Sequence, residues 1–182
     1  ATGLVPATDF SMVLSAQNSI GFGSESSLTT CTTAFATAAS INFLLEPSSL
    51  VHFNEELNTV PKVEILDAVG NRITVGPDSM ATVTFAVNTG TGVVTGPSTA
   101  VASAGVATAG PGFSISAKGM HSLIASVGPA TGTSVTFEMF SRATHLIFVQ
   151  QPVHGGVSGT AFTTLPIVEI VDADNDRVAT GP

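Results

Sequence analysis

Apolar and polar residues alternate with a period of two along much of the chain. In "PKVEILD", Val63 and Ile65 share one face, and Lys62, Glu64 and Leu66 share the other. This alternation is typical of a half-buried antiparallel strand. "ATVTFAV" and "SVTFEMF" show the same pattern, the latter with Val135, Phe137 and Met139 on its apolar face. We expect one core between two antiparallel sheets, formed by Val63, Ile65, Val83, Phe85, Leu123 and Phe137.

Turn residues separate these alternating runs. "DAVGN", "TGPD", "NTGTG", "VGPATG" and "HGGVSG" are among the breaks, and the chain contains 10 Pro and 18 Gly. "FNEELN" at 53–58 is the one helix candidate, and it is too short to be stable alone. The pattern therefore predicts an all-β protein with many short strands.

One phrase occurs twice at a separation of 105 positions. "PKVEILDAVGNRITVGP" starts at Pro61, and "PIVEIVDADNDRVATGP" starts at Pro166. Without gaps, 41–77 and 146–182 match at 12 of 37 positions. A period of this length is that of a small domain, so the sequence predicts tandem domains.

The order and spacing of several short motifs carry a family resemblance. "TVTFAV", "GTGVVTG", "GVATAG" and "KGMHSLIASVG", preceded by the repeated phrase, resemble the bacterial immunoglobulin-like repeats of invasin- and intimin-type surface proteins. The resemblance covers about 39–140 and resumes near 144. It implies tandem antiparallel β-sandwiches without the antibody-type disulfide, arranged in long extracellular arrays, and it implies no catalytic residues.

The resemblance divides the chain into three parts. We expect 1–38 to be the C-terminal part of a preceding repeat, 39–143 a complete immunoglobulin-like repeat and 144–182 the N-terminal part of the following one. In 1–38, Phe10 can be aligned with Phe113 and Ile20 with Leu123. Because the two flanks are too short to close a sandwich, we expect exposed apolar faces on the last strand, at Ile167, Val168, Ile170 and Val171.

Composition narrows the choice of partners and compartment. The net charge of −8, from 13 acidic and 5 basic residues, disfavours nucleic acid and anionic membrane surfaces. Only 10% of residues are charged, against about 25% in typical domains. A chain rich in hydroxyl and β-branched residues is typical of extracellular β-proteins, some of which carry O-linked sugar, although no N-glycosylation sequon occurs. We expect a cell-surface or secreted filament protein with no membrane insertion in this segment.

The single cysteine excludes an internal disulfide framework. Cys31 lies in "LTTCTTAF", where the alternation predicts a strand and a small buried side chain. The alternative is an intermolecular or reactive thiol.

His121 occupies a position where the related repeats usually carry an aromatic residue, and we expect a partly buried histidine with satisfied hydrogen bonds.

"DADND" places Asp172, Asp174 and Asp176 at alternate positions, which is the opening spacing of a calcium loop. The alternative is a β-turn, since Asp and Asn hydrogen-bond to their own backbone. The first copy has Asp67, Val69 and Asn71 at the matching positions, so it loses two carboxylates and keeps the turn residues. This comparison favours the turn over calcium, and no other cofactor is expected.

No motif for catalysis is apparent. His52, His121, His145 and His154 share no motif with an acid, and neither a G-x-S-x-G elbow nor an H-E-x-x-H pair occurs. Glu64 and Glu169 recur, but they lie on the outward face of their strands. We expect a protein that is not an enzyme.

The sequence therefore predicts a non-catalytic structural repeat of a stalk, spacer or fibre, whose partners are neighbouring copies of the same protein or adjacent repeats. The alternative is an adhesive module whose sandwich-end loops contact a host protein or a glycan. A third class, an accessory domain beside a secreted hydrolase, would be flanked by non-repeat sequence.

Overall fold

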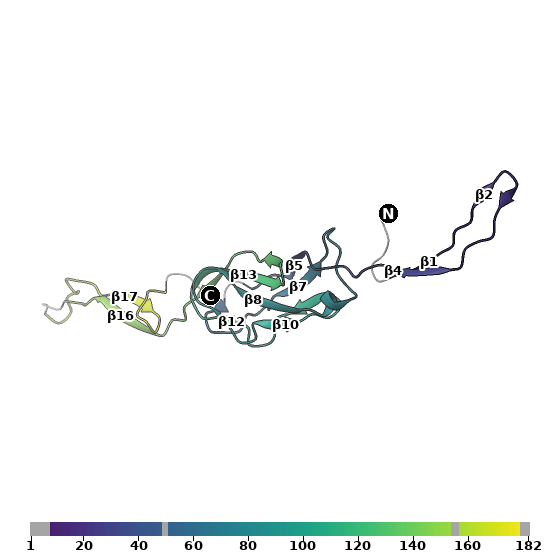
Figure 1. Cartoon of the computed structure of the whole chain (residues 1–182). Helices are drawn as coiled ribbons and strands as arrows, with labels where there is room; N and C mark the ends of the chain where they lie inside the picture. Colours follow the sequence, from purple (N-terminus) through teal and green to yellow (C-terminus); the bar gives the residue numbers. More distant parts are fainter. Residues whose placement is uncertain (1–7, 49–50, 154–156, 179–182) are drawn as a thin grey trace.

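The protein is all-β, as the sequence predicts. The computed structural model describes residues 8–48, 51–153 and 157–178. Within these ranges the chain forms several β-sheets and one short 3-10 helix, η1 (Pro77–Met80). Figure 1 shows a central body with an extended ribbon at each end. The strands are β1 (Asp9–Met12), β2 (Gln17–Asn18), β3 (Gly21–Phe22), β4 (Thr29–Thr32), β5 (Ser40–Leu45), β6 (Val51–His52), β7 (Lys62–Leu66), β8 (Thr82–Thr89), β9 (Val94–Thr95), β10 (Thr99–Val101), β11 (Val106–Thr108), β12 (Ser114–Ile115), β13 (Gly119–Val127), β14 (Ala130–Thr133), β15 (Phe137–Phe140), β16 (His145–Gln150) and β17 (Ile167–Val171).

Strands β5 to β15 make up the central body, which we call the central unit. Its larger sheet has the order β10-β8-β13-β15-β6, with β14 also paired to β13. Its second sheet has the order β11-β7-β5, and β12 pairs with β9 in a separate two-stranded sheet. All these pairs are antiparallel except β15 with β6.

Both sheets contribute side chains to one hydrophobic core. The six residues predicted from alternation, Val63, Ile65, Val83, Phe85, Leu123 and Phe137, are all buried in it, which confirms that they share one core. The rings of Phe85 and Phe113 meet edge to face with centroids 5.7 Å apart, a favourable geometry for aromatic pairs.

A glycine allows the two sheets to approach closely at one edge. A Cβ atom on Gly132 of β14 would lie 2.1 Å from the carbonyl oxygen of Ile41 in β5. No side chain fits in that space, so β14 can lie against β5 only with glycine at this position.

The repeated phrase forms the same structure twice. The first strand pair is β5 with β7, and the second strand pair is β16 with β17. Ile41 faces Ile65 in the first, and Leu146 faces Ile170 in the second. Adding 105 to the residue numbers of each partner in the first pair gives the partners in the second pair. Both registers also shift at the matching place, between Phe43 and Leu45 in the first pair and between Phe148 and Gln150 in the second. The predicted equivalence of the two copies is confirmed.

The turns that follow β7 and β17 are also alike. The Oδ1 atom of Asp67 accepts hydrogen bonds from the backbone N–H groups of Val69 (3.0 Å) and Asn71 (2.8 Å). The Oδ1 atom of Asp172 accepts the equivalent bonds from Asp174 (3.0 Å) and Asp176 (2.9 Å). Such side-chain bonds to the local backbone are the reason that aspartate favours turns.

Both turns also need one residue with positive φ. Gly70 has φ 84° and Asn175, its counterpart, has φ 65°. Glycine and asparagine are the residues that adopt this left-handed conformation most readily. The replacement of Gly70 by Asn175 between the copies therefore preserves the backbone.

The N-terminal ribbon, formed by β1 to β4, corrects the prediction for Cys31. Cys31 lies in β4 as expected, but its side chain is exposed, because no sheet covers this two-stranded ribbon in the described chain. Ile20 lies between β2 and β3 and is 94% exposed, whereas Leu123 is buried within β13. Ile20 and Leu123 therefore differ in local structure, since one lies in a turn and the other within a strand.

Residues 53–58, the helix candidate that is too short to be stable alone, form no helix. One further local prediction differs from the structure. In "SVTFEMF", Phe137 and Met139 are buried as predicted, but Val135 is exposed and Phe140 is buried. Val135 precedes the start of β15, so it does not belong to the face that the alternation assigned to it.

Candidate functional site

The most highly connected group of charges lies where the second strand pair meets the central unit. Lys118 immediately precedes β13, and Asp172 immediately follows β17. The Lys118 Nζ atom lies 2.9 Å from Asp172 Oδ2 and 2.5 Å from Asp176 Oδ2. We call Lys118, Asp172 and Asp176 the junction cluster.

The junction cluster shifts the pKa values of its members. The hydrogen bond from the Lys118 ammonium group holds the pKa of Asp172 well below its usual range, and a hydrogen bond with Ser141 acts in the same direction. Hydrogen bonds to Asp176 and then Asp172 raise the pKa of Lys118. Both groups are therefore charged at neutral pH, although Asp172 is only 3% exposed.

The structure favours the turn over the calcium alternative for Asp172, Asp174 and Asp176. Asp172 uses one oxygen for the turn and the other for Lys118. Asp174 does not join the junction cluster and lines a neighbouring pocket instead. Across the described ranges, no three His, Cys, Asp or Glu side chains are grouped so that they could hold a metal ion.

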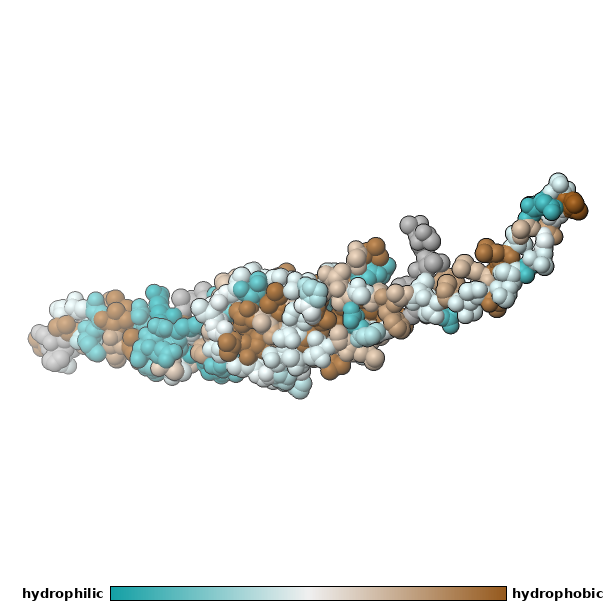
Figure 2. Space-filling view, in the orientation of Figure 1, coloured by the Kyte–Doolittle hydropathy of each residue, from teal (hydrophilic) through white to brown (hydrophobic). Residues whose placement is uncertain are grey.

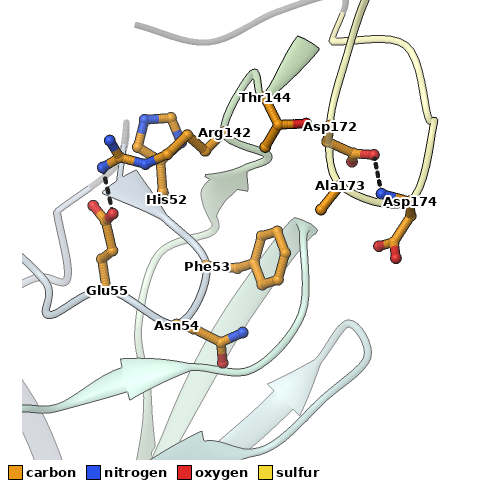
Figure 3. A pocket seen from close by; sticks show the side chains of 9 residues that line it. All are labelled: His52, Phe53, Asn54, Glu55, Arg142, Thr144, Asp172, Ala173 and Asp174. Carbon is orange, nitrogen blue, oxygen red and sulfur yellow. Dashed lines mark hydrogen bonds and ion pairs between the residues drawn. The ribbon is translucent and has the colours of Figure 1, made fainter.

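A pocket of about 320 Å³ lies beside the junction cluster (Figure 3). Arg142 and Glu55 form an ion pair at its edge, and the ring of Phe53 faces its interior in the view of Figure 3. The Arg142 and Glu55 side chains are both largely exposed, so their ion pair contributes little stability. The lining residues are His52, Phe53, Asn54, Glu55, Arg142, Thr144, Asp172, Ala173 and Asp174.

The approach to the central unit from the N-terminal side is built differently. There the backbone N–H of Ala38 donates to Asp78 Oδ2 at 2.7 Å. The Phe35 ring packs so closely over Gly76 that a Cβ atom on Gly76 would lie 2.5 Å from it. Asp67, the counterpart of Asp172, makes no ion pair with any residue that the structure describes.

The described histidines have separate surroundings. His121 is fully buried, where a partly buried side chain was predicted. Its Nε2 lies 3.0 Å from the Ala117 carbonyl oxygen, but its Nδ1 is buried without a hydrogen-bond partner among the described atoms, so the expectation of a satisfied histidine is wrong. His52 lines the pocket, and His145 Nε2 lies 2.9 Å from Asn175 Oδ1. His154 lies outside the described residues.

The two recurring glutamates form equivalent ion pairs across their turns. Glu64 Oε2 lies 2.7 Å from Arg72 Nη2, and Glu169 Oε1 lies 4.0 Å from Arg177 Nη1. Hydrogen bonds from Asn42 and then Arg72 lower the pKa of Glu64. Each glutamate therefore links its strand to the arginine that follows the turn. The sequence signal for these ion pairs was the recurrence of Arg72 as Arg177.

Lys118 is the site residue that the pattern of the sequence did not reveal. It lies 54 and 58 positions from its two partners, and it falls outside the repeated segment. The one available signal was the change from Asn71 to Asp176 between copies, which adds a carboxylate that the turn itself does not require.

Comparison with known proteins adds no identification: no protein-family model matches the sequence, and no curated protein matches it either. In the part of the chain that the structure describes, no helix has the length and apolar character needed to cross a membrane.

Proposed function

We propose that this chain is a segment of a long extracellular structural protein, built from tandem immunoglobulin-like β-sandwiches of the invasin and intimin type and serving as a stalk, spacer or fibre subunit without catalytic activity. The observation that carries the proposal is the residue-for-residue recurrence of a strand pair and its turn at a spacing of 105. A unit that recurs in register is the basis of arrays whose length grows with the number of units.

The burial of the two strand pairs supports a second sandwich that starts at 144. Val63 and Ile65 are fully buried, whereas their counterparts Val168 and Ile170 are 49% and 53% exposed. In the central unit, the larger sheet covers the apolar face of the first strand pair, and the equivalent face of the second strand pair is exposed. Figure 2 shows apolar residues on the surface of both end segments. Adjacent repeats or neighbouring copies are the partners that we propose for this face.

One residue of this face departs from the prediction. Val171 was expected to be exposed with Ile167, Val168 and Ile170, but it is buried. It ends β17 beside the junction cluster, and its carbonyl oxygen accepts a hydrogen bond from the Thr144 N–H at 2.9 Å.

An insertion at the period boundary tests the spacer function. A second copy of 40–144 is placed between Thr144 and His145, which preserves the order of all strands. Small-angle X-ray scattering should then show a maximum dimension longer by about one unit, with the cross-section unchanged.

The matched control places the same segment after Gly90, in the turn between β8 and β9. This insertion adds the same mass but places it in a turn of the central unit, away from the connection between β15 and β16. A spacer built on this period predicts rod growth only for the insertion after Thr144. If both variants had the same maximum dimension, the proposal would be overturned.

The pocket of Figure 3 favours an adhesive module as a second candidate function. It combines the Phe53 ring with amide, carboxylate and guanidinium groups, and such a combination suits a small polar ligand such as a sugar. Saturation-transfer NMR with a panel of free monosaccharides tests this function on the whole chain. Binding that Arg142→Ala abolishes and that Arg72→Ala leaves intact would support adhesion, and no transfer from any sugar would count against it.

A further inference from the structure

The connections on the two sides of the central unit are held by different forces. We propose that Lys118 acts as an electrostatic clamp, which holds the second strand pair in one orientation on the central unit and which dissolved salt releases. This inference rests on the proposed spacer function, because the stiffness of a stalk depends on the connections between its units.

The clamp acts across a short connection. Only residues 141–144 separate the end of β15 from the start of β16, and we call this segment the second joint. A connection of this length restricts the distance between the units but leaves rotation about the backbone open. Lys118 comes from the start of β13 and binds the turn after β17, so it links the two units at a second point. Two points of attachment remove rotational freedom that one connection leaves.

The carboxylates are arranged for this role. Asp172 Oδ1 is engaged by the turn, which directs Oδ2 toward Lys118. In the first copy, Asn71 occupies the position of Asp176, and the same turn forms there without a carboxylate at this position. Asp176 therefore adds a second charge for Lys118 without altering the backbone of the turn.

Solvent ions can reach the junction cluster. Lys118 is 39% exposed and Asp176 is 65% exposed in their side chains, whereas Asp172 is 5% exposed, so salt screens the Lys118–Asp176 pair more than the Lys118–Asp172 pair. A hollow of about 210 Å³ lies alongside and is lined in part by Lys118, Glu138, Ser141 and Arg177. Screening shortens the range of such interactions from about 10 Å at 0.1 M salt to about 3 Å at 1 M. The clamp should therefore weaken in high salt.

The first joint, residues 33–39, should not weaken in the same way. Its contacts with the central unit include the Phe35 ring on Gly76, the hydrogen bond from Ala38 to Asp78 and a hydrogen bond from the Ala39 N–H to the Leu66 carbonyl oxygen. Salt screens ion pairs, but it does not weaken apolar packing. The two joints therefore respond differently to ionic strength.

Distances between spin labels, measured by pulsed dipolar EPR, test the clamp on the whole chain. For the second joint, labels are placed at Thr99→Cys on β10 and Val168→Cys on β17, both exposed, in a Cys31→Ser background. For the first joint, the natural Cys31 is paired with Thr99→Cys. The 99–168 distance distribution should be narrow at about 0.05 M salt and about twofold broader at about 1 M, and the 31–99 distribution should change little.

Variants separate the clamp from general effects of charge. Lys118→Met should broaden the 99–168 distribution at low salt, Lys118→Arg should restore its width, and Asp176→Asn should have an intermediate effect while keeping the turn of the first copy. Lys62→Met on β7 removes the same charge elsewhere and should change nothing. Unfolding midpoints for all variants check that the central unit stays folded.

The outcomes distinguish the clamp from the spacer function itself. If the distribution is narrow in the parent chain and stays narrow in Lys118→Met, the clamp is overturned and the spacer function is untouched. If both distributions are broad in the parent chain at low salt, the units are loosely linked, and both the clamp and a stiff stalk are overturned.

Discussion

Ile65 and Ile170 occupy the same position in two strand pairs of identical register, yet Ile65 is fully buried and Ile170 is 53% exposed. Ile65 packs in the core between the two sheets of the central unit, and Ile170 has no such second sheet over it within the described chain.

This difference predicts unequal effects of the same substitution. Ile65→Ala should lower the free energy of unfolding of the central unit by about 2 to 5 kcal/mol, because it leaves a cavity in the core. Ile170→Ala should cost less than about 1 kcal/mol, as exposed positions usually do. Urea unfolding followed by circular dichroism measures both. Equal losses would mean that the second strand pair is covered in solution.

Gly132 should tolerate no side chain. Gly132→Ala places a Cβ atom where the Ile41 carbonyl oxygen lies 2.1 Å away, so β14 or β5 must move. We expect a loss of about 1 to 3 kcal/mol or more in the free energy of unfolding, the usual range for overpacking.

Gly110→Ala is the matched control for Gly132→Ala. Its nearest neighbours are side-chain atoms of Pro97 at 3.1 and 3.2 Å, so a small adjustment suffices and the loss should be smaller. A Gly132→Ala protein as stable as Gly110→Ala would contradict the close approach of β14 to β5.

Asp172 should remain ionised in acid to a lower pH than an ordinary aspartate. Because its pKa is lowered in the folded protein, its ion pair contributes fully above the unfolded value of about 3.9 and is lost as pH falls through the folded value. The raised pKa of Lys118 places the opposite limit at high pH: its contribution is full below about 10.4 and is lost as pH rises through the folded value. The clamp should therefore persist across the neutral range.

Side-chain carboxyl ¹³C NMR measures this titration directly. Lys118→Met should raise the titration midpoint of Asp172 and leave that of Asp67 unchanged, because the pKa of Asp67 is lowered by its own turn. A midpoint for Asp172 that is unaffected by Lys118→Met would show that the turn alone lowers its pKa.

Cys31 should react with a maleimide in the folded protein. Its side chain is exposed on β4, so modification should reach completion without denaturant. Cys31→Ser should leave the unfolding midpoint of the central unit unchanged, since no core contact is lost. Protection of the thiol until the chain unfolds would indicate that another surface covers the N-terminal ribbon.

The sequence by itself determined the strands, the turns and the period. Alternation identified Val63, Ile65 and Phe85 as core residues, because the faces of a strand follow from its period of two. The spacing of Asp67 and Asp172 identified two equivalent turns, because the bonds that form such a turn join residues at most four positions apart.

Only the tertiary structure decided which apolar faces are covered and which charges meet. Ile65 and Ile170 have the same local pattern, and their burial differs because a second sheet lies over one and not over the other. Cys31 is exposed for the same reason. The pairing of Lys118 with Asp172 and Asp176 depends on how two units lie against each other. Lys118 is separated from these partners by 54 and 58 positions in the sequence, and no local pattern encodes a contact over such a distance.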